Sequence, residues 1–490
     1  MSKEKMKGIS VKKEEDFSQW YSELVQKAEL ADIRYNVKGL VVYMPWATIT
    51  IKKMYQKYED ILESKGHLPL TMPSLIPEGN FLLESKHVEG FAPGVYWVTQ
   101  GGNKELEEKL ALRPTSETAL YQMYSLWIRS YNDLPFKRYQ SCQVWRYEGS
   151  DTRPFFRARE FHWIEAHNVF ATEEEARKQV IEDMETTYQV LTEIFCIPII
   201  FFQRPEWDKF PGAVHTFAAD ALMDSGRVLQ LPSTHLLGQN FSKPFNVKFL
   251  DEKNEEQYGY ITCYGPAISR IYGALIALLG DNQGLVLPWN LAPIHVVIVP
   301  IYRTNNKKEV VEEAKKIVQE QVKKFKHLKI KLDERDDISP GEKFNEWELK
   351  GVPLRIEIGP KDIEKQKVVV VNRIDGKKED VKMEELEEFI IKYETLFDEK
   401  LKERHVVKFE TQVENCESIE EIEKALKLNK IIRTGFCSIG LDGEECAEKI
   451  EKEYSAYVRG KRVDEEKEKF ERCVVCKKIA KETVYIARSY

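Results

Sequence analysis

The chain has 490 residues, which at roughly 150 residues per domain predicts about three domains. Hydrophobic residues make up 42% of the sequence and charged residues 32%, which provides enough apolar material for a large core and excludes an intrinsically disordered chain. The 74 lysines and arginines against 81 aspartates and glutamates give a net charge of −7, which excludes a uniformly basic surface but allows a local basic patch for nucleic acid.

Neither a membrane span nor a secretory signal is expected. The longest apolar runs, such as residues 274–279, are far shorter than a membrane span, and the charged start of the chain lacks the apolar segment of a secretory signal. We therefore predict a cytoplasmic protein with no membrane partner. Four of the eight cysteines lie at or after position 437, which in a reducing compartment suggests metal binding more than disulfides.

The first part of the chain predicts a polar tail over residues 1–16 and a large domain of mixed helix and strand over residues 17–290. The clearest helix in that domain is residues 172–195. Thr172 and Glu175 match the capping-box pattern, and apolar residues follow at helical spacing. One apolar stripe of this helix is expected to face a core.

A strand hairpin with arginines at its tip is the first candidate for chemistry. Residues 143–146 and 159–167 alternate in strand fashion around a polar loop, which predicts an antiparallel pair. Arg146 and Arg157, on the paired strands, would direct two planar guanidinium groups into one site. Each guanidinium can bind phosphate or carboxylate through two N–H donors. Phe161 would offer a stacking face for a base. This segment alone does not exclude a salt-bridged surface hairpin.

A second candidate is the loop Leu-Arg-Pro-Thr-Ser-Glu-Thr at residues 112–118. Thr115 and Glu117 are two residues apart on an extended loop, so both side chains point the same way and can hold a substrate ammonium. The alternative is a helix start, with Thr115 or Ser116 as the N-cap of a helix over residues 119–127. Both can hold if the loop caps the helix and still faces the site.

A third candidate is Arg270, which lies on an otherwise apolar helix. A buried guanidinium is costly unless its charge has a partner. A bound triphosphate or a structural carboxylate would supply that partner equally well.

The second domain is expected over residues 291–399. Strands and helices alternate there in a way that predicts an α/β domain of about a hundred residues. The expected strands are residues 294–299, 328–332, 354–358 and 368–371, and the expected helices are residues 309–325 and 383–397.

The third domain, residues 400–490, carries a cysteine pattern. Cys437 and Cys446 form a loosely spaced pair, and Cys473 and Cys476 form a CxxC pair. Four thiolates in two pairs suit tetrahedral zinc. Four ordinary reduced cysteines are the alternative that the spacing leaves open.

Together these segments resemble the class II aminoacyl-tRNA synthetases, and within them the prolyl-tRNA synthetases of the archaeal and eukaryotic type. The resemblance covers nearly all of residues 17–490. Motif 1 corresponds to residues 54–73, motif 2 to the Arg146–Phe161 segment and motif 3 to the Arg270 helix. The resemblance implies an antiparallel-sheet catalytic domain, an α/β anticodon-binding domain and a small zinc-bearing C-terminal α+β domain.

The same resemblance implies that the protein activates L-proline with ATP and Mg²⁺ to prolyl-adenylate, and esterifies the 3′ end of tRNA(Pro). The implied catalytic residues are the arginines that bind phosphates, Arg146, Arg157 and Arg270. Arg146 would also bind the proline carboxylate. The further implied ATP contacts are Glu148, Phe161, Gln230 and Ser233. The further implied proline contacts are Thr115, Glu117, Trp163, His167 and His235.

Three further expectations follow from the resemblance. Cys437, Cys446, Cys473 and Cys476 would hold a structural Zn²⁺, and the chain would form a homodimer through motif 1. The expected anticodon contacts are Glu346, Lys350, Arg355 and Arg373, for which a solvated charged face is nearly as good an interpretation. The interval between motifs 2 and 3 leaves no room for an internal editing domain.

Two alternatives are kept. One is a synthetase of the same fold for another amino acid, such as threonine, although threonyl relatives bind their substrate through zinc and no such ligand set is expected in this catalytic site. The other is a tRNA-binding paralogue without catalysis. Such paralogues usually lose the phosphate-binding arginines, which this chain keeps.

Overall fold

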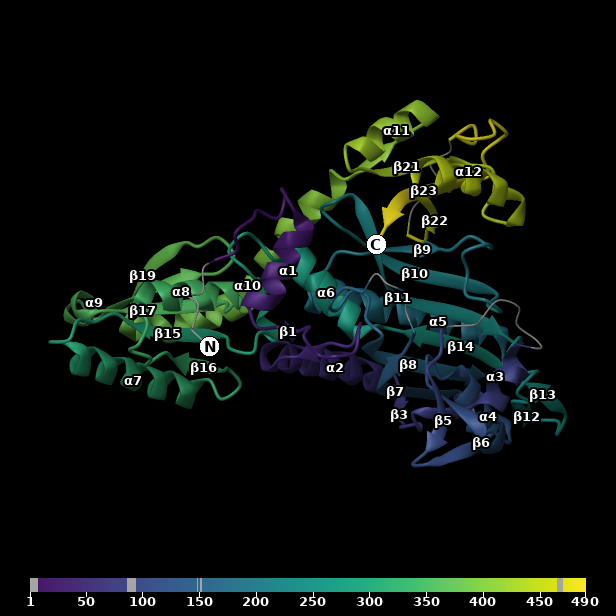
Figure 1. Ribbon diagram of the computed structural model, residues 1–490, viewed down its shortest axis with the longest axis horizontal. Coiled ribbons are helices and arrows are strands. Elements are labelled where there is room, and N and C mark those ends of the chain that lie inside the picture. The colour runs from purple at the N-terminus through teal and green to yellow at the C-terminus, as the bar shows by residue number, and fades with distance from the viewer. Residues whose placement is uncertain (1–7, 86–93, 148, 150–151, 465–469) are drawn as a thin grey trace.

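One sheet of eleven strands extends from the central lobe of the molecule into its C-terminal lobe (Figure 1). The computed structural model describes residues 8–85, 94–147, 149, 152–464 and 470–490. Most strands of the central part pair antiparallel, as the sequence predicts for the catalytic domain, whereas the edge strand at Leu68–Pro69 pairs parallel with its neighbour. In sheet order the strands are β20 (Val413–Asn415), β21 (Ile431–Phe436), β23 (Glu482–Ser489), β22 (Tyr457–Arg462), β9 (Ile200–Gln203), β10 (His215–Leu222), β11 (Arg227–Gly238), β14 (Tyr260–Gly265), β8 (Glu160–Phe170), β7 (Phe136–Trp145) and β3 (Leu68–Pro69).

Helices cover both faces of the central part of this sheet. On one face α2 (Pro45–Ser64), α5 (Glu173–Thr187) and α6 (Ile268–Leu279) enclose the largest apolar core. On the other face α4 (Glu117–Trp127) packs against a second apolar cluster. Ile164 and Ala166 of β8 belong to the first core and Val169 to the second, because successive strand side chains point to opposite faces.

Smaller elements surround this central lobe. They comprise two helices and three short sheets. They are α1 (Phe17–Lys27), β1 (Ala31–Asp32), β2 (Val42–Tyr43), β4 (Leu75–Pro77), α3 (Glu78–Ser85), β5 (Trp97–Gly101), β6 (Lys104–Leu112), β12 (Lys248–Leu250) and β13 (Glu256–Tyr258). Among the described residues, no helix combines the length and the apolarity that crossing a membrane requires.

The helix predicted over residues 172–195 is α5 followed by a π-helical segment at Tyr188–Ile194. The Thr172 hydroxyl accepts the Glu175 N–H at 3.3 Å and completes the predicted capping box. Val180, Met184 and Leu191 of the apolar stripe are buried, and Tyr188 is partly buried. The motif 1 helix, expected from position 54, begins earlier, with Pro45 at its first position.

The second lobe is the predicted α/β domain. Its five-stranded sheet mixes parallel and antiparallel pairs in the order β16 (Ile330–Leu332), β15 (Val296–Pro300), β17 (Leu354–Ile358), β18 (Lys367–Asn372) and β19 (Lys378–Lys382). Its helices are α7 (Lys307–Lys324), α8 (Pro340–Leu349), α9 (Pro360–Glu364) and α10 (Leu386–Glu410). Helix α8 was not predicted, although Ser339 and Glu342 form a capping box before it and mark its start in the sequence.

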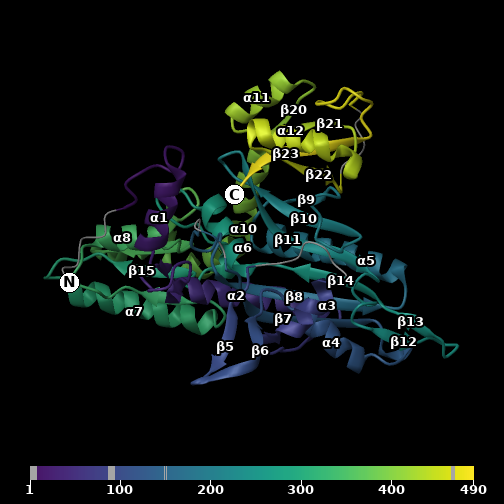
Figure 2. The ribbon, with the colours of Figure 1, turned by 45° about the vertical axis from the view of Figure 1, so that its right-hand side comes forward.

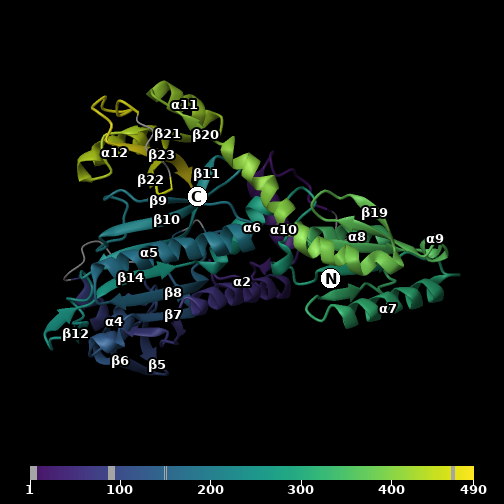
Figure 3. The ribbon, with the colours of Figure 1, turned by 180° about the vertical axis from the view of Figure 1, so that it is seen from behind.

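The C-terminal lobe carries α11 (Ile419–Lys427) and α12 (Glu444–Tyr454) on its own strands. It joins the central sheet through two strand pairs, β22 with β9 and β23 with β11. The chain end therefore lies at the junction of the two lobes (Figures 1 and 2). The domain limits expected at residues 290 and 399 stay predictions, and helix α10 runs across the second of them toward the C-terminal lobe (Figure 3).

The described part of the predicted N-terminal tail packs on the central lobe. Lys13 is only 7% exposed. Its ammonium lies 3.0 Å from the Asp224 carboxylate and donates to the Gly280 carbonyl at 2.9 Å. Charge pairing and a carbonyl acceptor thus anchor residues that composition alone would assign to solvent.

Candidate active site

A cavity of about 310 Å³ opens on the α4 face of the central sheet. Strands β8, β10, β11 and β14 form its floor, and the N-termini of α4 and α6 close two of its sides. Eight residues predicted to bind substrates line it: Thr115, Glu117, Arg146, Trp163, Gln230, Ser233, His235 and Arg270. They come from separate segments spread between Thr115 and Arg270, so the fold brings separate motifs to one place.

The loop before α4 leads into the helix and also faces the cavity, so the structure allows both interpretations of the sequence. Ser116 is the N-cap of α4, and Glu117 is the first residue of the helix, only 3% exposed. The Thr115 hydroxyl donates to the Glu117 carboxylate, and the Cys263 thiol approaches it at 3.5 Å. The carboxylate is thus fixed at the bottom of the cavity by two neighbours.

Arg146 follows the last residue of β7 and lies between the loop and the aromatic residues of β8. Its Nε donates to the Pro114 carbonyl at 3.1 Å. Its guanidinium lies 5.4 Å from the ring centres of both Phe161 and Trp163, within range of a cation–π attraction. Phe161 reaches the site through this contact but does not itself line the cavity.

Arg270 and Gln230 meet on another side of the cavity. Arg270 lies in the first turn of α6, where Nε donates to the Phe156 carbonyl at 3.1 Å and Nη1 lies 3.5 Å from the Gln230 carbonyl oxygen. Strand β11 carries Gln230 beside β10. The arginine of motif 3 therefore lies next to the residue that was predicted to contact ATP or its magnesium.

His235 is held neutral in the cavity wall. Its Nδ1 lies 3.0 Å from the Thr216 hydroxyl and its Nε2 3.1 Å from the Ser233 hydroxyl. Burial, together with the neighbouring His167, lowers the pKa of His235 to about 3. Near neutral pH this side chain therefore presents an uncharged face to a ligand.

Two sequence-based placements need correction. His167 does not line the cavity: it is fully buried between the Tyr121 hydroxyl at 2.9 Å and the Glu165 carboxylate at 3.2 Å. Arg157 does not lie on a strand, because it forms a short bridge with Arg153 in the connection ahead of β8. Both residues were assigned by position in a motif, which does not fix burial or loop shape. Glu148 lies outside the described residues.

Glu165 is the main residue that sequence reasoning missed. It lines the cavity and accepts hydrogen bonds from the N–H and hydroxyl of Ser116 at 3.0 and 3.1 Å. Burial alone would raise the pKa of Glu165, but hydrogen bonds from His167 and Ser116 and the charge of Arg113 hold it below its ordinary value. Its place in the alternation of β8, two residues after Trp163, was the available signal.

The other missed lining residues lie between or beside the predicted residues rather than in the motifs themselves. They come from the β9–β10 connection, from β10 and β11, and from β14 and its end. They are Arg204, Asp208, Lys209, Phe210, Pro211, Thr216, Leu231, Cys263, Gly265 and Ala267. A side chain at Gly265 would place its Cβ 2.6 Å from the Trp163 ring, so this glycine makes room for the indole.

Two groups of side chains have the geometry to hold a metal ion. The sulfur atoms of the predicted zinc ligands, Cys437, Cys446, Cys473 and Cys476, all lie within 4.8 Å of one another. The ligand atoms of Glu117, His167 and Cys263 do so as well; Glu117 and Cys263 line the cavity, and His167 is buried beside them. The second set was not expected from the sequence, because Cys263 comes from β14, far from the motifs.

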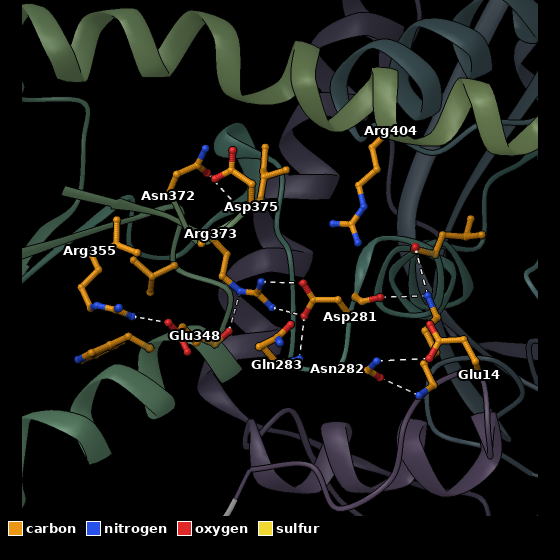
Figure 4. A pocket seen from close by; sticks show the side chains of 18 of the residues that line it. Glu14, Asp281, Asn282, Gln283, Glu348, Arg355, Asn372, Arg373, Asp375 and Arg404 are labelled. Carbon is orange, nitrogen blue, oxygen red and sulfur yellow. Dashed lines mark hydrogen bonds and ion pairs between the residues drawn. The ribbon is translucent and has the colours of Figure 1, made fainter. Parts of the chain in front are cut away.

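A second cavity, of about 590 Å³, lies between the central lobe, the second lobe and α10 (Figure 4). Arg355 and Arg373, two of the predicted anticodon contacts, line it, but both are paired with carboxylates. Arg373 donates to both Asp281 oxygens, at 2.6 and 2.8 Å, and Arg355 donates to Glu348 at 2.7 Å.

The other two predicted anticodon contacts lie beside this cavity but do not line it. Lys350 lies 3.0 Å from the Glu346 carboxylate and 2.9 Å from that of Glu29. Glu346 in turn accepts from Arg335 at 2.6 Å. The anticodon role of all four residues stays a prediction.

Comparison with known proteins matches three stretches of the chain to described families. Residues 96–278 match the family described as "tRNA synthetase class II core domain (G, H, P, S and T)". Residues 295–393 match "Anticodon binding domain", and residues 419–490 match "Prolyl-tRNA synthetase, C-terminal".

Similar proteins match the chain over nearly its whole length. The Proline--tRNA ligase of Thermofilum pendens is 49% identical over 485 residues, 99% of both chains, and that of Methanopyrus kandleri is 43% identical over 476 residues, 97% of this chain and 96% of the relative. A Giardia lamblia prolyl-tRNA synthetase solved in complex with prolyl-adenylate aligns with a TM-score of 0.95 and 36% identity, covering 98% of this chain and 100% of that one. The chain belongs to the prolyl-tRNA synthetase family of the class II aminoacyl-tRNA synthetases.

Proposed function

We infer that this enzyme activates L-proline with ATP to prolyl-adenylate and transfers the prolyl group to the 3′ end of tRNA(Pro). Relatives of the same length are proline–tRNA ligases, and the related synthetase of Cryptosporidium parvum, with a TM-score of 0.92 and 33% identity, was solved with halofuginone and AMPPNP, an ATP analogue. The observation that carries the residue assignment is one cavity lined both by a buried carboxylate, Glu117, and by the arginines Arg146 and Arg270.

Within this cavity, Glu117 and Thr115 would bind the ring nitrogen of proline. The secondary ammonium carries a positive charge and two N–H donors, which a fixed carboxylate and hydroxyl accept. Trp163 and the neutral His235 would border the apolar ring. His167 would act indirectly, through its hydrogen bond to Glu165.

Arg146 would hold the proline carboxylate and the α-phosphate together. The carboxylate oxygen attacks the α-phosphorus, and pyrophosphate leaves with the electron pair of the broken P–O bond. Positioning and charge neutralisation carry most of such a reaction, so no general base is required. Arg157, Arg270, Gln230, Ser233, Glu148, Phe161 and Mg²⁺ complete the proposed ATP site.

The test is ATP–pyrophosphate exchange with each standard amino acid, for the wild type and for Arg146→Ala. Exchange that is strongest with proline and is lost in the variant supports both the substrate and the residue. Arg177→Ala removes an exposed arginine on α5 and is the matched control, because its partner is the exposed Glu173. Exchange strongest with threonine would favour the alternative synthetase, and none in folded protein would favour the paralogue.

The cysteine cluster fits a structural Zn²⁺. The four sulfur atoms converge within 4.8 Å, and three of the four cysteines are buried. The CxxC pair lies in a tight turn, where the Lys477 N–H donates to the Cys473 carbonyl at 3.0 Å. Bound zinc would cross-link β21, α12 and this turn. About one zinc per chain is expected, and full occupancy in Cys473→Ser would contradict the four-cysteine site.

The homodimer is part of the proposal, through motif 1 and the segment before it. Large apolar side chains remain exposed there, at Ile33, Tyr35, Ile49 and Leu68. Leu68 lies on β3, the edge strand of the eleven-stranded sheet, whose free side can accept another chain. Sedimentation of the wild type and of Leu68→Lys distinguishes dimer from monomer. A cytoplasmic location also stays a proposal, supported by eight free thiols.

A further inference from the structure

Two arginines from different lobes share one buried aspartate beside the substrate cavity. Arg204 follows β9 and Asp220 lies on β10, both in the central lobe, whereas Arg459 lies on β22 of the C-terminal lobe. Arg204 Nη2 donates to Asp220 Oδ1 at 2.6 Å, and Arg459 Nε donates to Asp220 Oδ2 at 2.7 Å. The three side chains are 1%, 0% and 8% exposed, respectively.

This cluster carries an excess of positive charge. Two guanidinium groups face one carboxylate, and the next acid, Asp208, lies 4.0 Å from Arg204 Nε but is 49% exposed, so that water screens it. Burial and the charge of Arg459 lower the pKa of Arg204. An uncompensated buried cation is costly unless an anion approaches it. Arg204 lines the cavity, where the polyphosphate of ATP is that anion.

The cluster also fixes the side chain of Gln230. Arg204 Nη2 donates to Gln230 Oε1 at 3.2 Å, while Arg270 lies against the carbonyl oxygen of the same residue. With its amide oxygen occupied by Arg204, Gln230 has its NH₂ group left to donate. Phosphate oxygens accept such donors. Arg204 thus orients the amide that was predicted to contact ATP.

A glycine lets Arg459 reach the central lobe. Strand β22 pairs antiparallel with β9 on one side and with β23 on the other, and its register against β23 shifts between Val458 and Gly460. Gly460 has φ +115°, and a Cβ there would lie 2.0 Å from the Gln203 carbonyl oxygen. Such a bulge redirects the neighbouring side chain. The Arg459 carbonyl oxygen also accepts from Arg204 Nη1 at 2.9 Å, so both the backbone and the side chain of Arg459 contact the cluster.

We propose that Arg459 is a positioning residue for ATP: it holds Asp220, Asp220 holds Arg204, and Arg204 holds Gln230 at the cavity. The C-terminal lobe thereby completes the ATP side of a site that lies in the central lobe. The proposal rests on the proposed assignment of this cavity to ATP and proline. It implies that damage to the C-terminal lobe weakens ATP binding and leaves proline binding nearly unchanged.

The test compares Arg459→Met with Arg462→Met in the full chain. Arg462 lies on the same strand but pairs with Asp464, away from the cluster, so it controls for the loss of an arginine from β22. In ATP–pyrophosphate exchange we expect the KM for ATP to rise about tenfold or more in Arg459→Met, with the KM for proline changed less than about twofold. Arg462→Met should leave both constants at wild-type values.

Binding of a non-hydrolysable ATP analogue gives a readout that does not depend on exchange. Its Kd should rise by the same factor in Arg459→Met, and less in Arg459→Lys, which keeps the charge and tests the site even if the methionine variant does not fold. In an Arg204→Met background, Arg459→Met should add less than about twofold, because coupled residues are not additive. A purely structural role of Arg459 would lower the melting temperature without this pattern.

Unchanged ATP KM and analogue Kd in folded Arg459→Met would overturn the proposal. So would equal changes in the constants for ATP and proline, or full additivity with Arg204→Met. Absence of proline-dependent exchange in the wild type would count against the proposed function instead. In that case the analogue Kd would still decide whether Arg459 supports nucleotide binding.

Discussion

Two cavities contain predicted functional arginines, and they differ in how those arginines are held. In the substrate cavity, Arg146 and Arg270 come from different motifs and donate to backbone carbonyl oxygens beside the open space. In the cavity between the lobes, Arg355 and Arg373 are directed at neighbouring carboxylates (Figure 4).

This difference shows why an arginine at a position that matches a family motif or region is a weak guide to function. Hydrogen bonds to carbonyl oxygens do not neutralise the charge of a guanidinium. A guanidinium in a two-pronged pair with a carboxylate has both charge and geometry satisfied within the protein. Arg373 joins the second lobe to Asp281, just after the motif 3 helix, so its first role is to connect the lobes.

The largest effect is expected in the substrate cavity. Arg146→Ala should reduce proline-dependent exchange by about 10³-fold, because it removes charge stabilisation aimed at the reacting groups. Arg373→Ala should change the exchange by less than about threefold. Rates measured at saturating proline and ATP, with melting temperatures as the control for folding, make the comparison. Similar losses in both variants would remove the distinction between the two cavities.

A buried acid on α10 provides a prediction about pH. Burial raises the pKa of Asp398 on α10 to about 6, although the Trp289 N–H donates to it at 2.6 Å. A carboxyl group with a raised pKa stabilises the fold when protonated, so this stability is present below about pH 4 and is lost as the pH rises through about 6.

Asp398→Asn should therefore gain stability relative to the wild type, by up to about 3 kcal/mol, as the pH rises from about 4 to 8. Melting temperatures of both proteins over this range measure the difference. Glu399→Gln changes the next, exposed residue of the same helix and should follow the wild type. A difference between Asp398→Asn and wild type that stays constant with pH would contradict the raised pKa.

In the substrate cavity, Glu117→Gln should raise the KM for proline by about 100-fold, since a charge-assisted hydrogen bond is lost. The KM for ATP should change little. Steady-state exchange at varied proline and ATP separates the two constants. A rise of both constants together would mean that Glu117 supports the α4 start rather than the proline nitrogen.

The smallest effect concerns the pair between the lobes. Arg373→Met and Asp281→Asn each break the same partly buried ion pair, and each should cost about 2 kcal/mol of stability. If Arg373 only connects the lobes, both variants raise the KM for tRNA in aminoacylation equally. A rise confined to Arg373→Met would instead identify this arginine as an RNA contact.

Much of the fold could be predicted because its signals are local. The capping box at Thr172, the apolar runs of β15 and β17, and the cysteine spacing each lie within a short stretch of sequence. The start of α2 at Pro45 and the helix α8 were missed, although both carry local signals. Most predicted substrate residues line one cavity, whereas the burial of His167 depends on Tyr121 from another element.

The sequence by itself determined the family, the order of the three parts and the motifs that meet in the substrate cavity, because hydrophobic periodicity, caps and motif spacing are encoded along the chain. Only the tertiary structure decided which charges oppose one another: Arg373 against Asp281, Glu165 against Ser116, and Arg204 with Arg459 around Asp220. These partners are separated by up to hundreds of residues, and electrostatic energy depends on their distance and burial in space.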